Sequence, residues 1–304
     1  MLQALSFGVS VVPTVDVDQN RAVVAAAEQA GLDLVGVQDH PYVADHLDAF
    51  ALIGDFIART GKISFFPDVA NLPLRPAPML ARQASALSRL SGGRFHLGLG
   101  AGGYWDAITK LGVPRRSPKE ALDAQAEAIS LLRGLWQPRG HHVTASGEYY
   151  SVDHMASQEP GPGGVEIWVG AQGPRSLALT GRVADGWAAP IPSYLPYEKW
   201  AESNALIDRV AADAGRKPGE VRRIAQLVGT ITDTPGPVGL QGAEPIRTDA
   251  QGWADVLTEL AAQSFTGFVL WPEENAADQA RRFGEEVAPV VRVRLGQKPG
   301  WTQR

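Results

Sequence analysis

The feature that most constrains the fold is a repeated alternation between short apolar runs and longer stretches with helical spacing. Most of the apolar runs are followed by such a stretch, which is the pattern of a parallel sheet covered by helices. Eight runs occur, and eight strand–helix units close naturally into a barrel of about 250 residues or more. We therefore predict an α/β fold, a (β/α)8 TIM barrel with insertion loops, and a single domain over residues 1–304. The predicted strands are residues 5–11, 34–37, 63–69, 95–99, 165–169, 186–189, 223–231 and 267–271.

The predicted helices and loops fill the spaces between these strands. Two Gly- and Pro-rich insertions, at about 137–164 and 235–247, interrupt the alternation, and long loops of this kind commonly form lids or binding surfaces. Within the first, residues 142–152 alternate around Gly147 and predict a hairpin. The tail, 296–304, is expected to be loosely ordered. The predicted helices are residues 19–30, 50–58, 78–90, 117–135, 175–183, 196–214, 251–263 and 276–295.

Composition excludes several classes of function. The chain has no cysteine, which excludes disulfides, a thiolate nucleophile and cysteine-ligated metals. It carries 28 basic and 33 acidic residues, a net charge of −5, so nothing attracts nucleic acid or an anionic membrane. It contains neither a signal peptide nor an apolar run of the roughly 18 to 20 residues that a membrane span needs. We expect a soluble, cytoplasmic protein.

In a barrel of this kind, reactive residues follow the strands. Asp39 and His40 follow the second strand, where a histidine can exchange a proton or make a hydrogen bond near neutral pH. A histidine that only caps a loop is an equal alternative. Metal binding by His40 and His46 with Asp39 or Asp45 is a weaker alternative, since their spacing matches no common metal motif.

The third strand ends in the run from Asp68 to Asn71, followed by closely spaced prolines. A polar side chain inside an apolar run needs a partner when it is buried. The residues alone favour a rigid loop over a shaped surface for a flat ligand.

The fourth strand enters the glycine-rich run from Gly98 to Gly103, which permits close approach of a backbone or a ligand. Its G-x-G-x-G-G spacing differs from the dinucleotide fingerprint G-x-G-x-x-G, and no good helix starts directly after it. A dinucleotide fold is therefore disfavoured.

The fifth strand runs through Gly170 and Gly173 into a predicted helix start. Free backbone N–H groups and the helix dipole at such a turn bind anions, most often phosphate, and Arg175 could assist. We favour a phosphate site over an ordinary turn. Trp105, Trp168, Trp187 and Trp271 lie at or near strand ends, where most would pack and one or two would line a cavity.

Taken in order, these segments resemble the luciferase-like monooxygenase family, whose members are barrels that bind FMN or the deazaflavin coenzyme F420. The resemblance extends from the first strand to the last helix. It is carried by GLDLVGVQDH (31–40), LPLRPAPMLARQASALSRLSGGRFHLGLGAG (72–102), VGAQGPRSL (169–177) and ADGW (184–187).

The resemblance implies an enzyme that uses F420, because Asp-His after the second strand is similar to the deazaflavin-dependent members, whereas FMN-dependent members more often carry Glu-His. It also implies a non-proline cis peptide near Asp68-Val69, forming a bulge behind the ring, and a hydrogen bond from Asn71 to the ring. His40 and Asp39 are the implied catalytic residues. The implied cofactor-binding residues are Asp39, Asp68, Val69, Asn71, Gly100, Ala101, Gly102, Gly170, Ala171, Gln172, Gly173 and Arg175.

One departure limits the resemblance. Sugar-phosphate dehydrogenases of this family carry a glutamate just after the fourth-strand glycines, where this chain has Gly103 and then Tyr104. This difference argues against a sugar-phosphate reaction. The predicted function is therefore F420-dependent hydride transfer to or from a small organic substrate. The alternatives are an FMN-dependent monooxygenase served by a separate flavin reductase, and a cofactor-free barrel with a binding role. A homodimer is the expected assembly.

Overall fold

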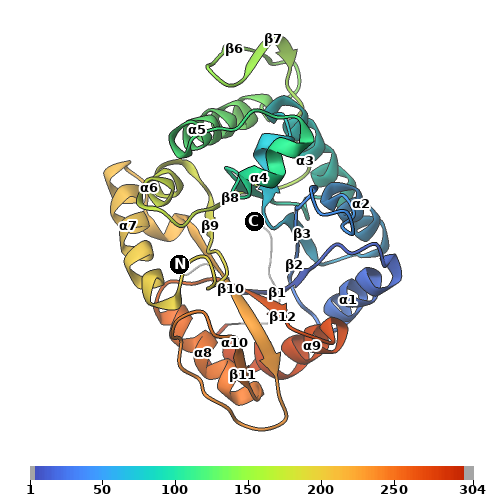
Figure 1. The fold of residues 1–304 in the computed structure, drawn as a ribbon. Helices are drawn as coiled ribbons and strands as arrows, with labels where there is room; N and C mark the ends of the chain where they lie inside the picture. Colours follow the sequence, from blue (N-terminus) through green and yellow to red (C-terminus); the bar gives the residue numbers. More distant parts are fainter. Residues whose placement is uncertain (1–3, 298–304) are drawn as a thin grey trace.

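Parallel strands arranged in a ring form the centre of the molecule (Figure 1), in a computed structural model that describes residues 4–297. All eight predicted strands are present and pair in parallel, which confirms the predicted barrel. Their apolar side chains fill the barrel and the space beneath the helices. The strands are β1 (Ser6–Val11), β2 (Leu34–Val37), β3 (Ser64–Pro67), β4 (Ala70–Asn71), β5 (Leu97–Gly100), β8 (Ile167–Gly170), β9 (Gly186–Ala188), β10 (Arg222–Ile231) and β12 (Gly267–Pro272).

The predicted third strand, 63–69, is divided. It continues only to Pro67 and resumes at Ala70, because a cis peptide bond joins Asp68 to Val69 between β3 and β4. β3 pairs with β2 and β4 pairs with β5, so the two pieces together occupy one position in the ring. A parallel bridge between Phe65 of β3 and Phe95, just before β5, extends the same contact lower down.

The helices surround the ring on its outer side (Figure 1). The fourth predicted helix begins with a capping box in which Ser117 accepts from the Glu120 N–H and Glu120 accepts from the Ser117 N–H. The barrel helices are α1 (Val17–Gln29), α2 (Ala49–Arg59), α3 (Ala77–Ser91), α5 (Pro118–Leu135), α6 (Pro174–Val183), α7 (Trp200–Asp213), α8 (Ala250–Ala262), α9 (Ala276–Arg282) and α10 (Ala288–Arg294). A short helix, α4 (Trp105–Ile108), and 3-10 turns at Leu72–Leu74, Thr109–Leu111, Tyr197–Lys199 and Pro218–Glu220 complete the connections.

Both predicted insertions carry strands. The first contains the expected hairpin, β6 (His142–Ser146) and β7 (Ser151–Ala156), which stands outside the helix ring beyond α5 (Figure 1). Its turn is tied to α5, because the Glu127 carboxylate accepts hydrogen bonds from the Tyr149 and Tyr150 backbones. The second insertion, predicted as loop, ends in a short strand, β11 (Ile246–Thr248), that pairs with β10.

The last predicted helix, 276–295, is interrupted by a π-helical turn over Phe283–Val287. Pro289 in the following turn has no N–H to donate, and Gly284 lies against the α1 end so closely that a Cβ atom there would be 2.5 Å from the Ala30 carbonyl oxygen. At the start of the predicted tail, the Gln297 side chain accepts a hydrogen bond from the Leu5 N–H. Residues 298–304 lie outside the described part of the chain.

A layer of large apolar side chains closes the lower half of the barrel. Phe66, Trp168 and Val269 are fully buried there, and Phe66 packs edge-on against Trp168 with ring centroids 5.0 Å apart. Because this layer fills the interior, space for a ligand is left above it, at the carboxyl ends of the strands.

Candidate functional site

A cavity of about 750 Å³ opens at the carboxyl ends of the parallel strands, and this volume suits a cofactor together with a small substrate. Loops after β2, β5, β8 and β9 contribute to it. Every residue that the sequence predicts for the site lies on its wall. These residues are Asp39, His40, Asp68, Val69, Asn71, Gly100, Ala101, Gly102, Gly170, Ala171, Gln172, Gly173 and Arg175.

Asp39, on this wall, is held in a fixed position. The Arg75 guanidinium binds it with two hydrogen bonds, 2.7 Å to Oδ1 and 2.8 Å to Oδ2, and the Asn71 backbone N–H donates to Oδ2 at 2.9 Å. Arg75 also pairs with Asp48 at 2.7 Å and lies 4.2 Å from the centre of the Phe50 ring. Both oxygens of Asp39 are thus engaged, so its contacts join the β2 loop to the β4 end.

His40 lies at the cavity edge beside Tyr42, whose hydroxyl is 2.7 Å from Nδ1 of the imidazole. Burial and the nearby His46 lower the pKa of His40, opposed by Asp39, so the ring is neutral at neutral pH. A neutral imidazole that is fixed through Nδ1 presents Nε2 as either a donor or an acceptor.

The bulge between β3 and β4 forms the back of the cavity. The Asp68–Val69 peptide is cis, as the family resemblance implied. A Cβ atom on Gly100 would lie 2.8 Å from Val69 Cγ2, and one on Gly170 would lie 3.1 Å from it. The glycines of β5 and β8 therefore make room for the Val69 side chain, which in turn reaches the cavity.

Two buried polar side chains flank the bulge with hydrogen-bonding capacity to spare. Asn71 Oδ1 and Asp68 Oδ2 have no hydrogen-bond partner among the described residues. Asp68 Oδ1 accepts a hydrogen bond from the Gln226 side chain of β10. Burial raises the pKa of Asp68 to about 7, against the opposing effect of that hydrogen bond. A buried group with an open acceptor points to a ligand or a water as its missing partner.

The α6 helix begins at Pro174 on the opposite side of the cavity. The Ser176 hydroxyl accepts a hydrogen bond from the Gly173 N–H at 3.2 Å, which closes the turn. The backbone N–H groups that follow Pro174 remain available at the helix start. Arg175 projects there as an exposed side chain on the cavity wall. The positive end of the α6 helix dipole and the Arg175 guanidinium together form a site that suits an anionic group.

Aromatic side chains from three loops cover the mouth. The rings of Tyr42 and Tyr104 lie 6.0 Å apart, and the Tyr104 hydroxyl contacts the Tyr194 hydroxyl. His40 meets Tyr104 edge-on at 6.0 Å. These rings shield the site from water, although Tyr104 and Tyr194 stay half exposed.

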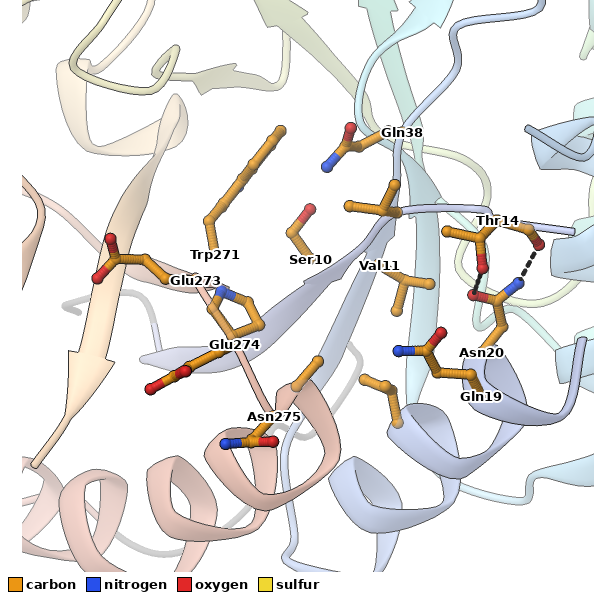
Figure 2. Close-up of a pocket in the computed structure, with 14 residues that line it drawn as sticks. Ser10, Val11, Thr14, Gln19, Asn20, Gln38, Trp271, Glu273, Glu274 and Asn275 are labelled. Carbon is orange, nitrogen blue, oxygen red and sulfur yellow. Dashed lines mark hydrogen bonds between the residues drawn. The ribbon is translucent and has the colours of Figure 1, made fainter. Parts of the chain in front are cut away.

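A second, smaller cavity of about 300 Å³ adjoins the first, and Trp271 lines both. Figure 2 shows the Ser10 hydroxyl and the Gln38 amide pointing into the space beside the Trp271 ring. The Asn20 amide, which donates to the Thr14 carbonyl at 2.7 Å, closes its far side. Glu273 at its rim is paired with Arg247.

Several site residues were not predicted from the sequence. Arg75 and Gln226 act through partners far along the chain, and Tyr42 and Tyr194 lie in loops without a motif. The one available signal was the amide of Gln226 within the apolar run of the seventh predicted strand.

Two kinds of feature are absent from residues 4–297. No cluster of three or more His, Asp or Glu side chains there is placed to hold a metal ion. No helix there is both long enough and apolar enough to cross a bilayer.

Known proteins with similar sequences align with most of this chain. An F420-dependent glucose-6-phosphate dehydrogenase of Beutenbergia cavernae is 35% identical, over 91% of this chain and 94% of its own length. A 5,10-methylenetetrahydromethanopterin reductase of Methanolobus tindarius is 31% identical, over 71% of this chain and 63% of its own length.

Solved structures share the fold at lower identity. An F420-dependent secondary alcohol dehydrogenase, in complex with an F420–acetone adduct, has a TM-score of 0.81 at 18% identity and covers 95% of this chain and 100% of its own. A long-chain alkane monooxygenase reaches the same TM-score at 14% identity, covering 99% of this chain and 94% of its own. The family model of the luciferase-like monooxygenases matches residues 4–238. This chain therefore belongs to the luciferase-like monooxygenase family.

Proposed function

We propose that the protein is an F420-dependent oxidoreductase that passes a hydride between the deazaflavin and a small organic substrate. The observation that carries this proposal is the convergence of the predicted residues on one 750 Å³ cavity with a bulge at its back and a helix start at its side. The similar protein of Beutenbergia cavernae, which is named for F420, supports the choice of cofactor.

The residues present fit a flat ring with an anionic tail. The unpartnered Oδ1 of Asn71 offers an acceptor to the N–H groups of such a ring, and Val69 offers an apolar surface behind it. The run from Gly170 to Gly173, together with Arg175, would hold phosphate at the α6 start. When bound, F420 supplies the two-electron hydride chemistry, while the protein supplies position and electrostatics.

The chain's own side chains would prepare this site in three ways. The Asp39–Arg75 pair fixes the β2 loop so that His40 stays at the cavity edge. Neutral His40, held by Tyr42, would orient the ring or exchange a proton through Nε2. Tyr104 and Tyr194 would exclude water. Of the catalytic residues predicted from the sequence, His40 keeps that role here, and Asp39 acts by positioning.

The charge of the cavity walls favours a substrate without phosphate. Among the described residues that line the two cavities, Arg175 alone carries a full positive charge, and it lies where the cofactor phosphate would bind. Glu273 and Glu274 lie at the rim of the smaller cavity. A second phosphate would find no cation there, which agrees with Gly103 in place of the glutamate of sugar-phosphate dehydrogenases.

The decisive experiment is a titration of the purified protein with F420 and with FMN, in which quenching of tryptophan fluorescence reports binding. We expect F420 to bind more tightly. Arg175→Gln should weaken F420 binding about 10- to 150-fold, since one charge-assisted hydrogen bond contributes roughly 1.5–3 kcal/mol. Arg182→Gln, an exposed change in the last turn of the same helix, is the matched control.

The other outcomes point to the alternatives. Preferential binding of FMN would favour a monooxygenase served by a flavin reductase, and binding of neither ring would favour a cofactor-free role. A homodimer and a cytoplasmic location stay predictions of the sequence.

A further inference from the structure

A chain of hydrogen bonds connects three strands above the apolar layer of the barrel. Trp271 Nε1 on β12 donates to Oε1 of Gln226 on β10, and Nε2 of Gln226 donates to Oδ1 of Asp68. The indole N–H can only donate, so the Gln226 oxygen must face it and the Gln226 amino group must face Asp68. The direction of the chain is therefore fixed, and Asp68 Oδ1 serves as an acceptor.

The second oxygen of Asp68 lies inside the barrel and has no hydrogen-bond partner among residues 4–297. A Cβ atom on Gly36 would be 2.7 Å from Asp68 Oδ2, so this oxygen sits directly over the β2 backbone. Ser10 is the register partner of Gly36 on the adjacent β1, and its hydroxyl is also buried with no partner among the described residues. Neighbouring strands lie about 4.8 Å apart, so one polar group could bridge both oxygens.

These two oxygens lie where the cavities meet. Asp68 lines the larger cavity, Ser10 lines the smaller one, and Trp271 lines both. Figure 2 shows the Ser10 hydroxyl directed toward the space beside the Trp271 ring. A ligand in the larger cavity could therefore reach Asp68 Oδ2.

We propose that Asp68 is an acid–base residue of this site, whose Oδ2 holds a proton and exchanges it with the bound ligand, while Gln226 and Trp271 are positioning residues. This inference rests on the proposed function. For reduction of a carbonyl substrate, bound F420 in its reduced form would supply the hydride, so that a C–H bond would form at the carbonyl carbon as the C=O double bond became a single bond. The Asp68 proton completes the O–H bond, and the carboxylate regains a proton from water. The oxidative direction reverses each transfer.

The surroundings of Asp68 suit this role. Burial raises its pKa to about 7, and the hydrogen bond from Gln226 acts in the opposite direction. Burial lowers the pKa of His40, so a neutral carboxylic acid and a neutral imidazole coexist in one cavity near neutral pH. The negative charge of Asp39 is balanced by Arg75. The remaining ionisable groups on the wall are Tyr42, Tyr104, Tyr194 and Arg175.

Infrared titration tests the proposal, because a protonated carboxylic acid has its own carbonyl band. The band would be followed from pH 5 to pH 9 in the protein alone and in the protein saturated with F420. We expect one carboxyl with a midpoint near pH 7, absent in Asp68→Asn, and a midpoint that moves by half a pH unit or more when F420 binds. Gln226→Leu should raise the midpoint because it removes the hydrogen bond. Gln125→Leu is the matched control, since that amide donates to the Leu99 carbonyl instead.

Three results would overturn the proposal. The band could persist in Asp68→Asn, the carboxyl could titrate only at ordinary acidic pH, or ligand binding could leave the midpoint unchanged. If FMN binds and F420 does not, the shift of the Asp68 midpoint is measured with FMN. The choice of F420 as cofactor is then rejected, while the role of Asp68 is still tested. If neither ring binds, the proposal fails together with the proposed function.

Discussion

Arg75 binds both carboxylate oxygens of Asp39 from a side chain that is only 10% exposed, and the Asp39 side chain is 1% exposed. A pair of this kind fixes geometry more than it stabilises, because desolvation of the two ions offsets their attraction. Removal of one partner, however, leaves a buried charge without compensation.

The first prediction follows from that pair. Arg75→Met should lower the free energy of unfolding by about 3–5 kcal/mol, measured by chemical denaturation. Arg59→Met removes the half-exposed pair with Asp55 and should cost less than about 1 kcal/mol. An Asp39→Asn/Arg75→Met double variant removes both charges and should recover part of the loss. Equal losses for Arg75→Met and Arg59→Met would contradict the buried-pair account.

A second prediction concerns His40. His40→Ala should reduce F420-linked turnover about 10²- to 10⁴-fold, the usual contribution of a positioned proton-transfer group, while the melting temperature stays close to that of the wild type. A substrate for the assay would come from a screen of small alcohols and ketones. His154→Ala, on the exposed hairpin, is the control. Unchanged turnover in His40→Ala would remove His40 from the mechanism.

A third prediction tests the bulge. Gly100→Ala would place a methyl group 2.8 Å from Val69 Cγ2, and such overpacking costs about 1–3 kcal/mol. F420 affinity should fall with stability, because Val69 forms the back of the cavity. Gly103→Ala, where a Cβ atom meets nothing within 4 Å, should change neither quantity. Restoration of stability by an added Val69→Ala change would tie the effect to this contact, and its failure would argue against it.

The fold was largely predictable, because eight strands and their helices leave a periodic record in the sequence. The site was partly predictable for a related reason: in a parallel barrel all strands end at one rim, so polar residues at strand ends meet there. The cis peptide at Asp68–Val69 was implied only by the family resemblance, since the residues alone favoured an ordinary rigid loop.

What the sequence did not reveal depends on contacts between distant residues. Gln226 and Asp68 are 158 positions apart, and only barrel closure brings the β10 amide to the carboxyl that follows β3. The ion pair of Arg75 with Asp39 likewise depends on how the β4 end returns over the β2 loop. The π turn at Phe283–Val287 arises from the close approach of Gly284 to α1, which no local pattern records.

A fourth prediction concerns substrate charge. Glucose 6-phosphate should not reduce F420 in the presence of this protein, because the described residues of the cavity walls offer no second cation for its phosphate. The absorbance of oxidised F420 reports the reaction, and the Beutenbergia cavernae relative, named for that activity, serves as the positive control. Reduction of F420 by glucose 6-phosphate at a rate similar to that relative would show that Arg175 or a residue outside the cavity walls binds the substrate phosphate.

The last prediction uses the pH dependence of stability in the protein without cofactor. The pKa of Asp68 rises from an ordinary 3.8 in the unfolded chain to about 7 in the folded protein. Between these values the folded state holds a proton that the unfolded state has lost, so Asp68 makes the free energy of unfolding fall as the pH rises through that window. Asn at this position cannot ionise, and Asp68→Asn should lack this contribution. The free energy of unfolding of Asp68→Asn minus that of the wild type should therefore increase between pH 5 and pH 8, by on the order of 2 kcal/mol. Denaturant unfolding at the two pH values measures this difference without any ligand. A difference that stays constant with pH would mean that the Asp68 carboxyl ionises as readily in the folded protein as in the unfolded chain, and it could not then hold a proton for a bound substrate at neutral pH.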